Sequence, residues 1–446
     1  MGTNWEVDNT GTLVKGTVPT TRLSGNVSGL VVVGQDGTAD ENFTCDGTAD
    51  NIQIQAALNT GNSVLVKHGI YELNSNLSFS AAGQMIIGEG RDLTILENKT
   101  AGGTCITVNQ ARCTILDITF RTKTGSSGDT SAIATAGGAA DLNITRVRIY
   151  DFGGYGLRMG GGGHITLYDC IIQGNDLNTG TKGEVRVNTY PAELIDCRIG
   201  DSTTVGVSVE NSKCSIQGSF VNGDIVIDRS NQTRIENNLI IGDIVLDDSI
   251  SAVKQTIITG NDIDGSITAT GSNGIQGIIS NNTITTNIAL NVAGCLDWTI
   301  IGNYMNSGSI SVRGDYCTIQ GNHYVGSITT RNDYIAIIGN SFDTSSAATI
   351  TLTSGSTTRS SVIGNTGLKT INSGSNQNTI HGNTFVSGGG GNINLTSADY
   401  NSVIGNTLSG GNINLDASSQ SNTVIGNTNS TINNLGGGTN QIANNT

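Results

Sequence analysis

The sequence predicts an all-β fold, a parallel β-solenoid with coils of about 21 residues. A four-residue element recurs along the chain: Ile or Val, then any residue, then Gly and Asn. Most occurrences are followed by a run of alternating apolar and polar residues, such as DIVID, NIALN or NINLT. Alternation of apolar and polar residues is typical of a strand with one buried face. The composition agrees with a thin, repetitive core, because the chain has 62 Gly, 2 Pro and only 4% aromatic residues.

The Asn of this element defines one position in each coil, which we call the corner slot. Asn tolerates the left-handed backbone of a sharp corner, and amides on stacked coils can bond to one another, so we expect an amide ladder. A second column is expected five residues earlier, at Asn378, Asn401, Asn422 and Asn440. The corner slot is occupied by Val147, Cys170, Cys197, Ser219, Asn238, Asn261, Asn282, Asn303, Asn322, Asn340, Asn365, Asn383, Asn406, Asn427 and Asn445.

The cysteines show no metal-binding spacing. The chain has 8 of them, without a CxxC pair or a Cys/His cluster. Cys170 and Cys197 fill the corner slot on neighbouring coils, where a disulfide is within reach. We expect stacked free thiols.

Residues 48–59, TADNIQIQAALN, predict a short helix that covers the strand edges of the first coil. Thr48 or Asp50 is expected to cap it, and Ile52, Ala56 and Leu58 to form its apolar side.

Charge and hydropathy exclude several classes of partner. The net charge of −14 argues against nucleic acid and anionic membrane surfaces. No apolar stretch reaches the length of a membrane span, and the start, MGTNWEVDNT, shows no signal peptide. The chain stops one residue after Asn445, in phase with the repeat, so we expect that the native protein continues or that a partner covers this end.

Three segments resemble the opening of the pectate-lyase-like β-helix proteins. They are DGTADNIQIQAALNT, VLVKHGIYELNSNLSF and IIGEGRDLTIL, and the resemblance extends over residues 36–446. It implies a right-handed, single-stranded parallel β-helix, a scaffold that hosts lyases, hydrolases and binding proteins. We expect a cap helix and first coils over 36–100 and repeats over 101–446.

The first 35 residues are similar to a segment of phage-type tail fibres. The matching positions are Gly16, Val18, Pro19, Arg22, Leu23, Ser24 and Gly25. This resemblance implies attachment to a virion tail or baseplate through residues 1–35, a virion or otherwise extracellular location, and a homotrimer.

An Asp–aromatic pair recurs on three coils, with two arginines nearby. Aromatic faces and carboxylates suit a sugar-binding groove, whereas the alternative is a solvated face of Asp–Arg pairs. The candidate glycan-binding residues are Asp297, Trp298, Arg313, Asp315, Tyr316, Tyr324, Arg331, Asp333 and Tyr334.

Glu210, Asp228 and Asp247 each follow the last apolar residue of an alternating run. Stacked acids raise one another's pKa, which suits a general acid. Acids on adjacent coils would lie about 5 Å apart, as in a retaining glycosidase, and those two coils apart about 9.5 Å, as in an inverting one. A solvated face and a Ca²⁺ site are the alternatives, and no cofactor is required.

Basic residues gather on the early coils, at Arg146, Arg148, Arg158, Arg186 and Arg198. A β-elimination lyase uses such a base beside carboxylate-bound Ca²⁺, but no Asp cluster lies beside Arg186, so a hydrolase is favoured over a lyase. The sequence therefore predicts a tail-spike-like protein that recognises host-surface polysaccharide. The alternatives are a polysaccharide-degrading enzyme and a structural surface protein or adhesin.

Overall fold

A computed structural model describes residues 29–37, 40–100, 103–122, 130–161, 163–175, 183–188, 191–201, 205–210, 213–248, 253–271, 275–306, 308–331, 333–344, 348–353, 359–386, 391–436 and 439–446. Contacts divide the chain into unit 1, residues 1–204, and unit 2, residues 205–446. The predicted tail-fibre-like positions Gly16–Gly25 lie outside the described residues.

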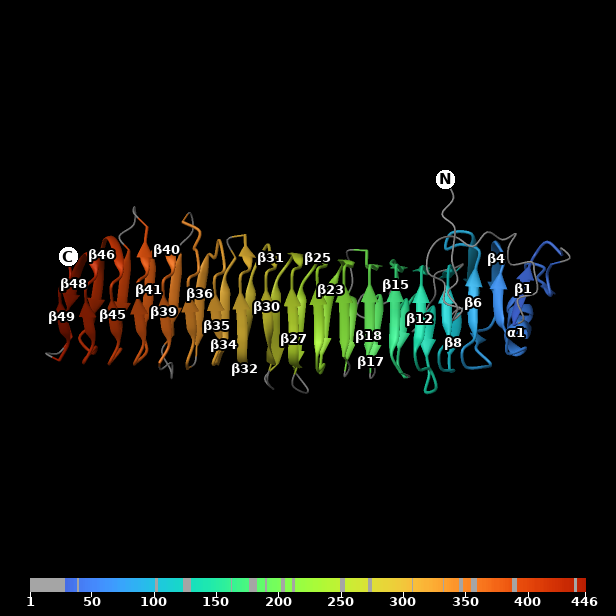
Figure 1. The fold of residues 1–446 in the computed structure, drawn as a ribbon, viewed down its shortest axis with the longest axis horizontal. Helices are drawn as coiled ribbons and strands as arrows, with labels where there is room; N and C mark the ends of the chain where they lie inside the picture. The colour runs from blue at the N-terminus through green and yellow to red at the C-terminus, as the bar shows by residue number, and fades with distance from the viewer. Residues whose placement is uncertain are drawn as a thin grey trace, which may run out of the picture. The chain divides into compact units, whose positions relative to one another are not determined.

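Each unit is a parallel β-solenoid, so the predicted fold class is confirmed. The turns contain about 22 residues and are of the right-handed type. Strands at the same position of successive coils pair in parallel and lie side by side (Figure 1), which gives each unit three faces.

In unit 1, face 1 consists of β5 (Leu77–Ser78), β8 (Ile106–Val108), β11 (Ile133–Thr135), β14 (Leu157–Met159) and β17 (Val185–Asn188). Face 2 consists of β1 (Leu30–Gly34) with β2 (Phe43–Thr44) beside it, β3 (Ser63–Val66), β6 (Met85–Gly88), β9 (Thr114–Leu116), β12 (Leu142–Thr145), β15 (Ile165–Tyr168) and β18 (Ala192–Ile195). Face 3 consists of β4 (Gly69–Leu73), β7 (Thr94–Asn98), β10 (Thr119–Thr122), β13 (Arg148–Tyr150), β16 (Ile171–Ile172) and β19 (Arg198–Ile199).

In unit 2, face 1 consists of β20 (Val205–Glu210), β23 (Asp224–Asp228), β26 (Ile244–Asp248), β29 (Ile267–Gly271), the first part of β32 (Ile288–Ile301), β34 (Ile310–Asp315), β36 (Ser327–Arg331), β38 (Thr349–Leu352), β41 (Thr370–Ser373), β44 (Asn392–Leu395), β46 (Thr407–Leu415) and β48 (Thr428–Asn434). Face 2 consists of β21 (Cys214–Gln217), β24 (Thr233–Glu236), β27 (Val253–Thr259), β30 (Ile275–Ser280), the rest of β32, β35 (Thr318–Gln320), β37 (Ala336–Ile338), β39 (Ser361–Ile363), β42 (Thr379–His381), β45 (Ser402–Ile404), β47 (Thr423–Ile425) and β49 (Gln441–Ala443). Face 3 consists of β22 (Phe220–Asn222), β25 (Leu239–Ile241), β28 (Asp262–Asp264), β31 (Thr283–Ile284), β33 (Tyr304–Met305), β40 (Thr366–Leu368) and β43 (Thr384–Phe385).

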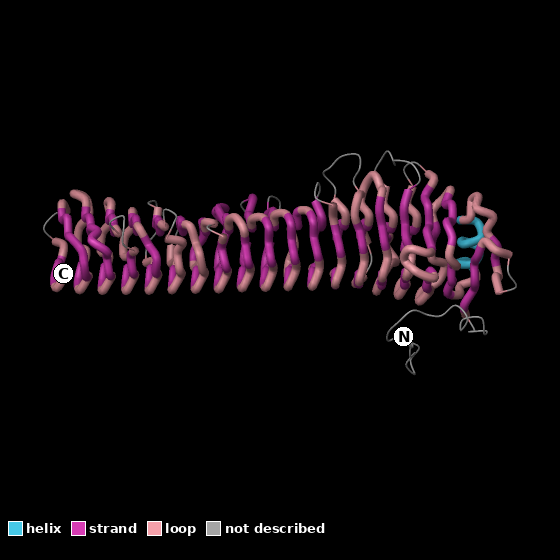
Figure 2. Tube along the Cα trace, turned by 90° about the horizontal axis from the view of Figure 1, so that it is seen from above, coloured by secondary structure: helices cyan, strands magenta, loops and turns pink. Residues whose placement is uncertain are grey.

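Helix α1 (Asn51–Asn59) lies at the first coils of unit 1, against β1, β3 and β5 (Figure 2). The predicted helix is therefore confirmed, but its details differ. The Asp50 carboxylate makes no capping bond, because it accepts from the backbone N–H groups of Gly47 and Glu72 at 2.9 Å. Ile52 is exposed, and Ile54, Ala57 and Leu58 form the buried side.

The corner slots hold the predicted amide ladder in unit 2. From Asn238 to Asn427, each slot Nδ2 donates to the Oδ1 of the next slot at 2.9–3.0 Å. Each slot Nδ2 also donates to a backbone carbonyl of the preceding coil, such as Ile300 O from Asn322 at 3.0 Å. The column at Asn378, Asn401, Asn422 and Asn440 forms a second ladder, in which each backbone N–H donates to the Oδ1 of the next Asn at 2.8–2.9 Å.

The left-handed backbone lies one residue earlier than predicted. Gly302 and Gly321, which precede corner slots, have φ of 66° and 60°, and no corner-slot Asn has a positive φ among the described residues. Gly makes the corner on most coils of unit 2, and Asn237, Asn281 and Asn444 make it on the others with φ of 57°, 54° and 52°, whereas the slot Asn fills the space inside the corner. In unit 1 the slots at Val147, Cys170 and Cys197 are buried, and none of the eight cysteines of the chain forms a disulfide.

Candidate functional site

The three predicted acids lie side by side on face 1 of unit 2. In the strand register, Glu210 is opposite Asp228 and Asp228 is opposite Asp247. Side chains alternate between the two faces of a strand, so Asp228 points outward because its neighbours Ile225 and Ile227 point inward and are fully buried. Adjacent strands are about 4.8 Å apart, so the Cα atoms of neighbouring acids have that spacing.

Arg229 neutralises part of this acidic group. Its Nε donates to Asp228 Oδ2 at 2.9 Å, and its Nη2 lies 3.9 Å from Glu210 Oε2. Asp228 Oδ1 is nevertheless buried without a hydrogen-bond partner. Burial raises the pKa of Asp228, the charge of Arg229 lowers it, and Asp247 and Glu210 raise it, with a net upward shift. The arrangement suits a carboxyl group that holds its proton longer than usual.

The calcium alternative gains no geometric support from the described residues. Among them, no group of three or more His, Cys, Asp or Glu side chains is arranged to hold a metal ion.

Two predicted glycan-binding arginines continue the column of the acids. Asp247 is opposite Thr270, and on later strands of face 1 Arg313 is opposite Arg331. Asn291 and Arg313 each follow the in-register pair Leu290–Val312, which places Asn291 between Thr270 and Arg313. We call this outward line, from Glu210 to Arg331, the charged column: three acids, two uncharged residues and two arginines. The acids and the arginines were predicted as two separate ladders. Counting three residues on from the Ile that opens each run joins them, because Asp228 follows Ile225 and Arg331 follows Ile328 at this distance.

Tyr316 and Tyr334 stack at the corner that follows the charged column. Their ring centroids are 4.9 Å apart and their planes differ by 8°. Tyr316 is 59% exposed and Tyr334 37% exposed. Both have a left-handed backbone, with φ of 59° and 60°, which directs the side chains outward from the corner.

Arg359 extends this aromatic stack by one coil. Its guanidinium lies over the Tyr334 ring, with Cζ 5.7 Å from the centroid, and its Nη1 donates to the Tyr334 hydroxyl at 2.7 Å. Nε donates to Gln377 at 3.1 Å, which fixes the guanidinium plane. Tyr334 is thus sandwiched, and Tyr316 carries the outer end of the stack.

Trp298 was wrongly assigned to the glycan-binding surface. Its side chain is fully buried, and its Nε1 makes no hydrogen bond. Trp298 stands five residues before its corner slot, as Cys317 does, whereas Tyr316 stands six residues before. The outward residue on the coil of Trp298 is Asp297, which has φ of 53° and accepts from Gln276 Nε2 at 3.4 Å.

The remaining predicted residues divide between two corners. The Asp315 carboxylate accepts the Asp333 backbone N–H at 2.9 Å, a bond that joins consecutive coils. Tyr324 lies on the other side of the corner slot and contacts Tyr304, with centroids 5.1 Å apart and planes tilted by 51°. It therefore belongs to a second exposed aromatic pair.

The early arginines of unit 1 do not form one ladder. Arg146 makes two bonds of 2.7 Å to Asp117, and Arg148 pairs with Asp92 at 3.3 Å. Arg158 and Arg186 are opposite each other on β14 and β17, and Arg186 lies over Tyr155. Arg198 is on β19, on a different face.

Glu184 is a buried acid of unit 1 that the sequence analysis missed. It is fully buried, accepts the Asn175 backbone N–H at 3.3 Å, and also accepts from Asn175 Nδ2. Burial raises the pKa of Glu184 to about 7, against the lowering effect of the bonds from Asn175. No repeat pattern marks this residue, because it stands outside the alternating run.

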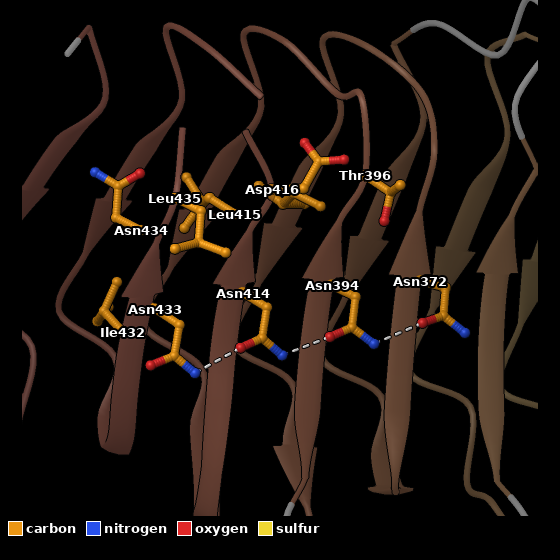
Figure 3. A pocket seen from close by; sticks show the side chains of 11 residues that line it. Asn372, Asn394, Thr396, Asn414, Leu415, Asp416, Ile432, Asn433, Asn434 and Leu435 are labelled. Carbon is orange, nitrogen blue, oxygen red and sulfur yellow. Dashed lines mark hydrogen bonds between the residues drawn. The ribbon is translucent and has the colours of Figure 1, made fainter. Parts of the chain in front are cut away.

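A hollow of about 730 Å³ lies on unit 2, over an outward amide ladder (Figure 3). In this ladder Asn433 donates to Asn414, Asn414 to Asn394, and Asn394 to Asn372, at 2.7–2.8 Å. Thr396, Asp416 and Leu435 also line the hollow. Its uncharged donors and acceptors suit a hydroxyl-bearing ligand. The outward Asn residues of NINL and TINN were the available sequence signal.

Comparison with known proteins finds matches among solved structures. No protein-family model matches the chain, and no curated protein matches it. Among solved structures, tailspike protein 2 of the Escherichia coli O157:H7 bacteriophage CAB120 is 14% identical with a TM-score of 0.41, and the match covers 64% of this chain and 42% of that one. The A-module of an Azotobacter vinelandii mannuronan C-5 epimerase is 15% identical with a TM-score of 0.34, over 92% of this chain and 99% of that one. A pectin methylesterase from Erwinia chrysanthemi is 17% identical with a TM-score of 0.29, over 48% and 80%. The chain thus spans less than half of the tailspike's length. No helix within the described ranges is long and apolar enough to cross a membrane.

Proposed function

We propose that this protein is a tail-spike-like protein that recognises a host-surface polysaccharide through face 1 of unit 2. The observation that carries the proposal is the exposed stack of Tyr316, Tyr334 and Arg359 beside the charged column. Aromatic rings bind the C–H faces of sugars, and arginine and carboxylate side chains bind their hydroxyl groups. Exposed groups fixed on a rigid scaffold bind with little loss of conformational freedom.

The test is binding to a panel of bacterial and archaeal surface polysaccharides. Tyr316→Asn removes the outer ring but keeps a residue that tolerates a positive φ. We expect at least a 10-fold weaker affinity, since the loss of one such contact costs about 1.4 kcal/mol or more.

Tyr400→Asn is the matched control. Tyr400 is 63% exposed and has φ of 58°, at the same corner position of a later coil, and no ring contact of it is found among the described residues. Equal losses in both variants, or binding unchanged in Tyr316→Asn, would contradict the proposal.

A second candidate function is hydrolysis of the bound polysaccharide at the acidic end of the charged column. The unpartnered Oδ1 of Asp228 favours it, because a carboxyl group with a raised pKa and a free oxygen suits a general acid. The spacing of about 4.8 Å between adjacent strands is close to that of a retaining pair. The test is the formation of new reducing ends in the polysaccharide. Reducing ends that are absent in Asp228→Asn, with binding retained, would support hydrolysis.

Two other outcomes would point to other functions. Unsaturated ends would indicate a lyase, and the absence of both binding and products would favour the structural surface protein.

Attachment to a virion through residues 1–35 and assembly as a homotrimer belong to the same proposal. Their support is the tail-fibre-like sequence around Gly16–Gly25. Sedimentation velocity of the whole chain and of a chain that starts at residue 29 tests both the trimer and its dependence on this segment. A monomer in both would contradict the trimer.

A further inference from the structure

Arg313 and Arg331 place two like charges side by side on β34 and β36. They are directly opposite each other in the register, so their Cα atoms are about 4.8 Å apart. Like charges directly opposite on neighbouring strands destabilise a sheet. Such a pair needs an explanation from fold or function.

The fold does not neutralise this pair. Within the described part of the chain, neither Arg313 nor Arg331 takes part in an ion pair or a hydrogen bond of its side chain. Asp315 stands two residues after Arg313, but its carboxylate accepts the backbone N–H of Asp333. The strands that flank the pair offer Asn291 and Thr353, which carry no charge.

A shortage of acids does not explain the unpaired arginines. The chain has a net charge of −14, and other arginines have acidic partners, such as Arg146 with Asp117, Arg229 with Asp228 and Arg234 with Glu236. The unneutralised pair is thus a local feature of the charged column.

We propose that Arg313 and Arg331 bind the anionic groups of an acidic polysaccharide, either carboxylates or sulfates. Two guanidinium groups on adjacent strands can clamp one planar or tetrahedral anion, or two anions in sequence. Tyr316 stands three residues after Arg313, within about 10 Å along the chain, so one sugar can contact both. The inference rests on the proposed function, and it adds the chemical class of the polymer.

The acidic end of the same column sets the direction of the ligand. Asp247 lies three strands before Arg313, or about 14 Å at the strand spacing. Anionic groups are repelled from Glu210, Asp228 and Asp247 and attracted to the arginine end. The charged sugars of the ligand therefore lie over β34 and β36.

The experiment compares matched acidic and neutral polymers. Dextran sulfate is compared with dextran, and polygalacturonate with its carboxyl-reduced derivative, at about 0.05 M and about 0.5 M NaCl. We expect the acidic member of at least one pair to bind 10-fold or more tightly, and the preference to shrink at high salt because exposed charges are screened. Arg313→Gln/Arg331→Gln removes the preference, whereas Arg234→Gln, an exposed paired arginine on β24, leaves it unchanged.

A second readout keeps the inference testable if none of these polymers fits the sugar-binding surface. Sulfate should raise the Tm of the wild-type protein more than chloride at equal ionic strength. Exclusion of sulfate from protein surfaces stabilises every variant, so the test is that the excess is smaller in Arg313→Gln/Arg331→Gln than in Arg234→Gln. The inference is overturned if neutral polymers bind as tightly as acidic ones, or if the sulfate excess is equal in these two variants. If Tyr316→Asn loses polysaccharide binding but the wild-type protein shows no preference for acidic polymers, the inference is overturned and the proposed function stands. If sulfate stabilises the protein through the two arginines but no polysaccharide binds, the anion site is supported and the proposed function is contradicted.

Discussion

Units 1 and 2 fill the same corner of the coil in different ways. In unit 1, the thiols of Cys170 and Cys197 are buried and hydrogen-bond to each other, and each also contacts a backbone carbonyl of the preceding coil, such as Ile144 O at 3.5 Å from Cys170 Sγ. In unit 2, each slot amide bonds to the next coil and to the preceding one. A thiol is a weak donor and acceptor, whereas an amide makes ordinary hydrogen bonds to the coils on both sides. The difference teaches that one backbone corner supports coil-to-coil bonding of two strengths, weak in unit 1 and strong in unit 2.

The largest expected effect comes from breaking the ladder of unit 2. Asn322→Ala removes the Oδ1 that accepts the backbone N–H and Nδ2 of Asn303 at 3.0 and 2.9 Å, and leaves both donors buried. Each buried unsatisfied group costs about 1–3 kcal/mol, so we expect a loss of about 3–5 kcal/mol in the free energy of unfolding.

Cys170→Ala in unit 1 is the comparison, with an expected loss of about 1–2 kcal/mol from a small cavity. Guanidinium denaturation measures the losses, and hydrogen exchange at Asn303 shows whether the damage spreads to the neighbouring coil. Equal losses at both slots would remove the distinction between the units.

The second effect concerns the buried acid of unit 1. Native Glu184 keeps its proton up to a pKa of about 7, whereas the unfolded chain releases it near the ordinary value of 4.5. The native state binds more protons between these values, so the free energy of unfolding falls as pH rises through this range and levels off above it. The total fall is about 3 kcal/mol, at about 1.4 kcal/mol per pKa unit.

Glu184→Gln should abolish this fall, so that the variant is less dependent on pH between about 4.5 and 7. Denaturation curves at several pH values measure it, with Glu193→Gln, a half-exposed acid of the same unit, as control. A wild-type protein whose stability rises over this range would contradict the prediction.

The smallest effect is expected at the acidic end of the charged column. Burial raises the pKa of Asp228 despite Arg229, so the ionised carboxylate slightly destabilises the native state at neutral pH. Asp228→Asn should stabilise unit 2 at pH 7 by less than about 1 kcal/mol, because Arg229 loses an ion pair at the same time. The gain should disappear at acidic pH, where the wild-type carboxyl is protonated. A Tm that falls at pH 7 would show that the ion pair outweighs burial.

Much of the fold could be predicted because each coil repeats the same constraints. Alternation gave the strands, the corner slots gave the ladder, and the amphipathic run at 48–59 gave the helix. The site was harder, because it depends on register to a single residue. Trp298 and Tyr316 stand one position apart relative to their corner slots, and one is buried while the other is exposed. Glu184 could not be found from the repeat, since its burial comes from packing rather than from periodicity.

The inner amide ladder also makes unit 2 electrically polar along its axis. Every slot Nδ2 from Asn238 to Asn427 donates toward the C-terminal side, so the amide dipoles align and add, with the negative end at Asn238 and the positive end at Asn445. The outward ladder from Asn433 to Asn372 donates in the opposite direction. The two columns oppose each other in the last coils, whereas among the described residues between Asn238 and Asn340 no such opposing Asn column accompanies the inner ladder. Asp247 and the two arginines of the charged column lie on that stretch, on a scaffold whose interior has a direction as well as a repeat.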